Sequence, residues 1–136
     1  MNPFPFFIDL NVRVGDLNYG NHVGHQHFFL YFHEVRLAYL NQLGFSESDI
    51  QGLSLVVAEA HCRYRHELLL GDQIRVFCRI SEIKAKVFIF EYQITRHETV
   101  CATGTTTCLC LDPRRKRAVS LPADFLEAVQ RFEQIR

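Results

Sequence analysis

The sequence predicts an α+β domain in which one antiparallel sheet packs around one long helix. A long, mostly apolar segment runs from residue 24 to residue 43 and stops at Gly44, as expected of a buried helix. One segment of alternating apolar and polar residues precedes it, and four segments of strand character follow it. We expect one domain over residues 1–136, because this length suits a single hydrophobic core.

The expected strands are read from their period of two. The first covers residues 6–14 and leads into a polar, glycine-bearing loop at 15–24. After a polar turn at 45–52, further strands are expected over 56–64, 73–80, 88–95 and 100–111. Short polar breaks separate them, so consecutive strands are expected to pair antiparallel.

The predicted central helix carries apolar residues on nearly every face. A helix that is apolar all round is normally enclosed, so we expect the sheet to wrap around it. A last, amphipathic helix is expected from Pro122, because Phe125, Val129 and Phe132 recur at i, i+4 and i+7.

Composition excludes several protein classes. Lys+Arg and Asp+Glu both number 15, and this zero formal charge argues against a nucleic-acid partner. No apolar run approaches the ~18 residues of a membrane span, and the N-terminal residues lack a basic signal-peptide region. The five cysteines are unevenly spaced, which indicates reduced, buried thiols and a cytoplasmic location.

The loop before the helix holds the first candidate site residues. A helix N-terminus carries unpaired amides and the positive end of the dipole, so the backbone amides of Gly24 and His25 are candidate oxyanion donors. Asn18, Asp16 and His22 are candidates to orient or activate water. Their structural alternatives are a turn residue, a cap for backbone amides and a loop anchor, respectively.

Glu34 lies about ten residues into the predicted helix. A carboxylate in a buried helix needs either a partner or a function. Glu34 is therefore a candidate catalytic carboxylate. The alternative is an ion pair with Arg36, with an arginine on a neighbouring strand or with another subunit.

Two further patterns are interpreted structurally. His22, His25 and His27 read as H-x-x-H-x-H, but His25 and His27 do not share a helix face and no carboxylate or cysteine completes a ligand set, so no metal is expected. Cys108 and Cys110 point to one face of a strand and are expected to be small buried hydrophobes.

Several segments together match the pattern of a known family. They are Val12-Arg13-Val14-Gly15-Asp16-Leu17-Asn18, His22-Val23, the helix residues Tyr31, Glu34 and Arg36, Leu43-Gly44, and Tyr64 followed by Gly71-Asp72. The chain thereby resembles the hotdog-fold acyl-CoA thioesterases of the 4-hydroxybenzoyl-CoA thioesterase family. It departs from them at Asn18, where many members have the catalytic Asp, at Asn21 in place of Gly, and at Gly24-His25 in place of Asn-Asn.

The resemblance implies a hotdog fold, with a five-stranded antiparallel sheet around one central helix and a short C-terminal helix. It implies hydrolysis of acyl-CoA thioesters to a free acid and coenzyme A, without a cofactor beyond the coenzyme A of the substrate. It also implies a homodimer with active sites at the subunit interface, and a homotetramer remains open. Tyr31 and the basic cluster at 114–117, with Arg114 and Arg115, are the expected substrate contacts.

The catalytic assignment stays open among several residues. An amide has no useful basicity, so we expect Asn18 to orient the reactants while Glu34, Asp16 or His22 acts as the base. A hydratase on the same fold is one alternative, and it requires Asp16 and His22 to converge on one pocket. A non-catalytic acyl-CoA binding protein is the other. The phenylalanines could line an aliphatic or an aromatic acyl pocket equally well.

Overall fold

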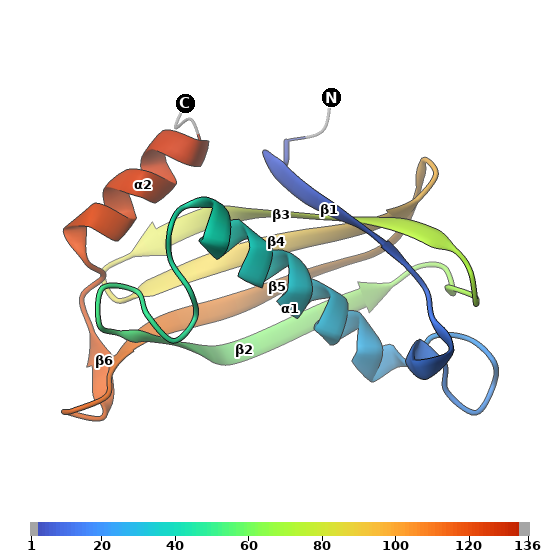
Figure 1. Ribbon diagram of the computed structural model, residues 1–136, viewed down its shortest axis with the longest axis horizontal. Helices are drawn as coiled ribbons and strands as arrows, with labels where there is room; N and C mark the ends of the chain where they lie inside the picture. Colours follow the sequence, from blue (N-terminus) through green and yellow to red (C-terminus); the bar gives the residue numbers. More distant parts are fainter. Residues whose placement is uncertain (1–2, 134–136) are drawn as a thin grey trace.

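The computed structural model describes residues 3–133, and one antiparallel sheet dominates it (Figure 1). The elements are β1 (Phe6–Asn11), the 3-10 turn η1 (Val14–Asp16), α1 (His25–Gln42), β2 (Ser54–Tyr64), β3 (Gln73–Lys84), β4 (Val87–Arg96), β5 (Thr99–Asp112), β6 (Arg117–Val119) and α2 (Ala123–Glu133). The strand order is β1-β3-β4-β5-β2, and β6 pairs with β5. The predicted α+β class is therefore confirmed.

Consecutive strands pair only from β3 onward. β2 pairs with β5 and β3 pairs with β1 at the opposite edge, so the expectation that β2 and β3 are neighbours is wrong. Residues 65–72 carry the chain past the start of α1, where the Val23 N–H donates to the Leu68 carbonyl at 2.9 Å. The short strand β6 lies outside the elements expected from sequence.

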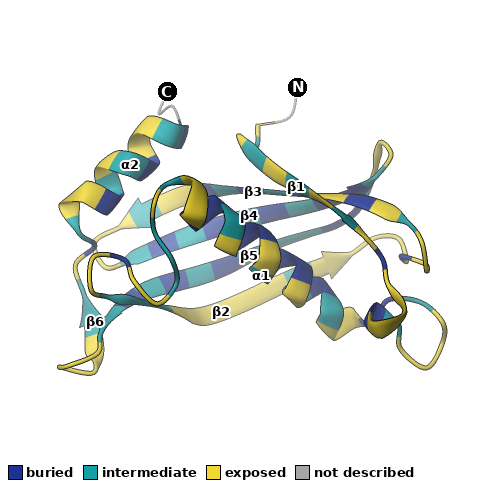
Figure 2. Cartoon of the chain, viewed as in Figure 1, coloured by how far each residue is buried: buried dark blue, intermediate teal, exposed yellow. Residues whose placement is uncertain are grey.

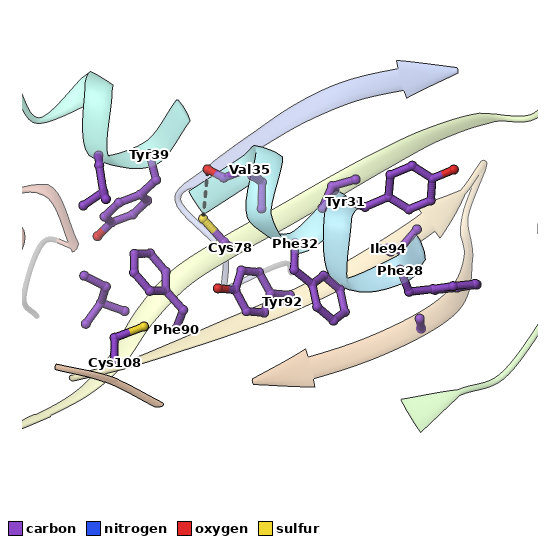
Figure 3. Close-up of a cluster of buried hydrophobic side chains, with 14 of the residues drawn as sticks. Phe28, Tyr31, Phe32, Val35, Tyr39, Cys78, Phe90, Tyr92, Ile94 and Cys108 are labelled. Atoms are coloured by element: carbon purple, nitrogen blue, oxygen red, sulfur yellow. Dashed lines mark hydrogen bonds between the residues drawn. The ribbon is translucent and has the colours of Figure 1, made fainter. Parts of the chain in front are cut away.

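Helix α1 lies across one face of the sheet (Figure 1). Gly24 is its N-cap, and Gly44 follows its C-terminus with a φ of 90°, a left-handed conformation that favours glycine. The helix bounds are thus close to those predicted. On the sheet side, Phe32 stacks on Tyr92 with ring centroids 4.5 Å apart (Figure 3).

The outer face of α1 is exposed, so the expectation of a helix enclosed on all sides is wrong (Figure 2). Leu30 and Leu37 are 47% and 38% exposed, and Glu34 lies between them on the same face. A single sheet contacts only one side of a helix. The residues opposite that side remain open whatever their hydropathy.

Helix α2 packs at the end of the sheet remote from the loop 17–24 (Figure 1). Its Phe125 contacts Phe45 and Phe88 edge-on, and its Phe132 contacts Tyr39. Phe125 and Val129 are buried, which confirms the predicted amphipathic register.

The five cysteines are free thiols. All are buried except Cys62, which is half-buried. Burial raises the pKa of Cys110 to about 11, so this thiol stays protonated near neutral pH. The expectation that Cys108 and Cys110 are buried hydrophobes is confirmed.

Candidate active site

The segment between η1 and α1 forms a small hairpin at the start of the helix. The Asn18 N–H donates to the His22 carbonyl at 2.8 Å, and the turn closes at Asn21, whose φ is 66°. Asn18 Oδ1 accepts a hydrogen bond from the Gly20 N–H at 2.8 Å. The side chain of Asn18 therefore supports the turn through its oxygen, and within residues 3–133 its Nδ2 donors have no hydrogen-bond partner.

His22 leans toward the segment that crosses from β2 to β3. Its Nδ1 lies 3.3 Å from Glu67 Oε1, and its side chain is 41% exposed. His22 also forms an isolated β-bridge with Leu69. These contacts anchor the loop, and they do not bring His22 to Asp16. The Asp16–His22 pair that the hydratase alternative requires is not formed.

Asp16 is buried beneath the hairpin, and both of its oxygens are occupied. Oδ2 accepts hydrogen bonds from the Tyr31 hydroxyl at 2.8 Å and the Arg13 N–H at 3.0 Å, while Oδ1 lies 2.8 Å from His27 Nε2. Burial alone would raise the pKa of Asp16. The hydrogen bonds from the Arg13 N–H and the Tyr31 hydroxyl, with the electrostatic effect of His27 and Arg13, outweigh burial, so the pKa of Asp16 is lowered and the group is an ionised acceptor.

Tyr31 belongs to this cluster and is almost completely buried. It is 2% exposed, and its hydroxyl is donated to Asp16. Burial, then the hydrogen bond to Asp16, raises the pKa of Tyr31. The substrate contact expected of Tyr31 stays a prediction, and in this structure the hydroxyl is donated to Asp16.

Glu34 lies on the exposed face of α1, which corrects the expectation of a buried carboxylate. It shares a groove with Arg13, Asp16 and Tyr31. The partner expected for it, Arg36, is buried and directs its Nε to Glu47 Oε2 at 2.6 Å. Among residues 3–133 Glu34 forms no ion pair.

Of the two backbone amides predicted as oxyanion donors at the start of α1, one is unpaired among the described residues. The Gly24 N–H donates to the Asp16 carbonyl at 3.3 Å, whereas the His25 N–H has no hydrogen-bond partner in the described part of the chain. The Gln26 side chain folds over Gly24, where a Cβ would come 2.8 Å from its Oε1. Glycine at position 24 therefore allows this close approach.

Tyr64 fixes the start of α1 to the end of β2. Its hydroxyl donates to the His25 carbonyl at 2.8 Å, and its ring meets Phe28 edge-on at 4.9 Å. The predictions from sequence missed this contact and also the contact of His27 with Asp16. The i, i+4 spacing of His27 and Tyr31 was the available signal, because it places both on one face of the helix.

Arg114 and Arg115 lie in the turn between β5 and β6, at the other end of the sheet from the hairpin (Figure 1). Both backbone N–H groups donate to Asp112 Oδ1, at 2.9 and 3.4 Å. Within one chain the two arginines are therefore remote from Asn18 and His25.

Known proteins are similar to this chain over most of its length. Residues 12–129 match the family model of the thioesterase-like superfamily. The chain belongs to this superfamily. It is 25% identical to the acyl-CoA thioesterase YbgC of Haemophilus influenzae, over 88% of this chain and 90% of that protein. The crystal structure of a thioesterase complexed with coenzyme A and Zn from Thermus thermophilus has a TM-score of 0.89 at 25% identity, covering 98% of both chains. A hypothetical protein of Aquifex aeolicus has a TM-score of 0.86 at 27% identity, covering 92% of this chain and 99% of that one.

Membership of the thioesterase-like superfamily confirms the resemblance, the hotdog fold and the expectation of a thioester hydrolase. Within residues 3–133, neither helix combines the length and hydropathy needed to cross a bilayer. The same residues contain no group of three His, Cys, Asp or Glu side chains placed to hold a metal ion.

Proposed function

We propose that this protein hydrolyses acyl-CoA thioesters to a free acid and coenzyme A. The observation that carries the proposal is the unpaired His25 N–H at the N-terminus of α1. It is supported by two relatives, the YbgC protein named as an acyl-CoA thioesterase and the Thermus thermophilus thioesterase crystallised with coenzyme A.

The His25 N–H stabilises the oxyanion that forms when water attacks the thioester carbonyl. The partial positive charge of the helix N-terminus reinforces this donor. Its contribution is largest in the tetrahedral intermediate, where the oxygen carries a full charge. The leaving group is a thiolate, which departs more readily than an alkoxide because thiols have a pKa of about 8.5.

Asn18 orients the reactants. Its Oδ1 is held by the Gly20 N–H, so the amide plane is fixed and its Nδ2 donors are directed by the turn. A donor can hold the attacking water or the thioester oxygen. This role needs no basicity, and it suits an amide where many relatives of the resembled family carry a carboxylate.

The enzyme acts as a homodimer joined along β2. One edge of β2 pairs with β5, and among residues 3–133 no strand pairs with its other edge. Val56 and Val57 on this strand are exposed. β2 has 11 residues and the opposite edge strand β1 has 6, so β2 offers the longer surface for pairing. A second copy related by a two-fold axis would extend the sheet antiparallel, and unpaired edges favour such addition.

This dimer explains the remote arginines. Ser54, the first residue of β2, pairs with Leu111 beside the turn that holds Arg114 and Arg115. In an antiparallel pair the start of one β2 faces the end of the other, which is Tyr64. Each turn therefore lies near the partner's α1 start, where the two guanidinium groups bind the phosphates of coenzyme A.

Release of free thiol from a panel of short, long and aromatic acyl-CoAs tests the proposal. We expect catalytic turnover with at least one class of acyl group. Binding of coenzyme A esters without any thiol release would contradict hydrolysis, and it would support the non-catalytic binding alternative instead.

A further inference from the structure

We propose that His27 is the general base that activates the hydrolytic water, and that Asp16 is the residue that positions it. This inference rests on the proposed thioester hydrolysis. It concerns a side chain that was not among the catalytic candidates from the sequence.

The contact with Asp16 fixes the tautomer of His27. Nε2 of His27 lies 2.8 Å from Asp16 Oδ1, and the Asp16 side chain is 3% exposed. An ionised carboxylate only accepts hydrogen bonds, so Nε2 must carry the proton. The neutral imidazole then has its lone pair on Nδ1, where a base needs it.

Asp16 is itself held rigidly. The Tyr31 hydroxyl and the Arg13 N–H bind its second oxygen, and its carbonyl accepts the Gly24 N–H. The His27 ring also meets the Tyr31 ring edge-on at 5.2 Å. The imidazole is therefore oriented on two sides before any substrate arrives, as pre-organised catalysis requires.

His27 and the proposed oxyanion donor belong to the same turn of α1. His27 is two residues after His25, in the first turn of α1. Side chains of a helix lean toward its N-terminus, so the ring and the unpaired amide face the same end. The His27 side chain is 19% exposed, and its Nδ1 has no hydrogen-bond partner among residues 3–133.

The other candidate bases are placed less well. His22 directs Nδ1 toward Glu67 on the exposed hairpin. Glu34 lies nine residues beyond His25, which is about 13 Å along the helix axis. Both oxygens of Asp16 are occupied.

The reaction balances with these groups. The water oxygen bonds to the carbonyl carbon, its proton passes to His27 Nδ1, and the carbonyl π electrons move to the oxygen held by the His25 N–H. When the carbonyl re-forms, the C–S bond breaks and the thiolate leaves with the electron pair. The thiolate takes the proton from Nδ1. Asp16 stays ionised throughout and stabilises the imidazolium, as a carboxylate does in histidine-based catalysis.

His27→Ala with and without added imidazole tests the base. We expect kcat/KM to fall by about 10²–10⁴-fold and to recover in part with imidazole, because a general base contributes this range. We also expect the acidic limb of the pH profile to disappear. The titratable groups in contact with His27 are Asp16 from η1 and Tyr31 on α1. Arg13 acts on Asp16 and Glu34 acts on Tyr31, so Glu34→Gln is run beside His27→Ala to separate their influence.

His33→Ala is the matched control. His33 is also on α1, and its Nε2 also meets a carboxylate, Glu47 Oε1 at 3.0 Å. It lies away from the first turn of the helix. We expect its activity to stay within a few-fold of the parent, with the acidic limb retained and without any effect of imidazole.

Asp16→Asn tests the positioning role. We expect kcat to fall with little change in KM, and the ¹⁵N spectrum of His27 to shift from the Nε2–H tautomer to a mixture. If His27 of the parent enzyme carries its proton on Nδ1 and not on Nε2, the proposal is overturned. This measurement needs no substrate.

The outcomes separate this inference from the proposed function. A parent that releases no thiol from acyl-CoA or from small thioesters overturns both. If the parent is active and His27→Ala and His33→Ala have the same activity, the assignment of His27 as the base is overturned but the proposed function is not. The same holds for a loss in His27→Ala that imidazole does not restore and that keeps the acidic limb, because that result assigns His27 a structural role.

Discussion

Gly104→Ala is expected to destabilise the fold strongly. Gly104 lies in β5, which is flanked by β4 and β2. A Cβ at this position would collide with the Phe32 ring and would lie 2.6 Å from the His61 carbonyl oxygen of β2. The carbonyl is part of a paired strand, and Phe32 is fully buried against Tyr92. Neither neighbour can move away without disturbing the core.

The expected magnitude follows from overpacking. An extra methyl group in a close-packed core costs typically about 1–3 kcal/mol. At about 2 kcal/mol the midpoint of thermal unfolding falls by roughly 6–10 °C for a chain of this size. Urea unfolding followed by circular dichroism, at one fixed protein concentration, measures the free energy of unfolding.

Gly15→Ala is the matched control for this measurement. A Cβ at Gly15 would meet nothing within 4 Å. We expect its free energy of unfolding to stay within about 0.5 kcal/mol of the parent or to rise slightly, since alanine restricts the unfolded chain. Equal stability of Gly104→Ala and Gly15→Ala would refute the reasoning from the Phe32 contact.

Two further predictions concern charge and assembly. The pKa of Asp16 is lower in the folded chain than its ordinary 3.8, so its contribution to stability is present above about pH 4 and is lost as the pH falls through the folded value. Asp16→Asn should therefore destabilise the protein at pH 7. In urea unfolding, the difference in free energy of unfolding between the parent and Asp16→Asn should be smaller at pH 3, and a difference independent of pH would contradict this. Val57→Lys should dissociate the dimer in sedimentation, because a lysine on an open edge opposes strand pairing, while Val14→Lys, 73% exposed on η1, should not; an intact Val57→Lys dimer would place the interface elsewhere.

Local features of the fold were predictable because local residues determine them. Gly24 and Gly44 mark the two ends of α1, and the alternation of apolar and polar residues places the strands near their observed limits. Strand partners were not predictable, since alternation reports which face is buried and not which strand lies alongside. The prediction that α1 is enclosed on all sides was wrong at Leu30 and Leu37, because an apolar residue can occupy the exposed side of a helix.

The candidate site was predictable as a location but not as a set of contacts. The sequence places Asn18, Asp16 and His22 in one loop before a helix, and the structure keeps them there. Their partners come from segments far apart in the chain. Asp16 meets His27 and Tyr31 across the hairpin, and His22 meets Glu67 on another crossing segment. Such contacts depend on tertiary packing, which spacing in the sequence does not encode.

Removing the His25 amide tests the central claim most directly. Proline is favoured at the first position of a helix and lacks the N–H, and Gly24 already has the extended backbone (φ −66°, ψ 146°) that a following proline requires. His25→Pro thus deletes the proposed oxyanion donor, whereas His25→Ala keeps that donor and deletes only the imidazole. At saturating acyl-CoA we expect coenzyme A release by His25→Pro to fall about 10²–10³-fold, with His25→Ala within a few-fold of the parent. Equal rates for the two variants would contradict the assignment of this helix N-terminus as the oxyanion site.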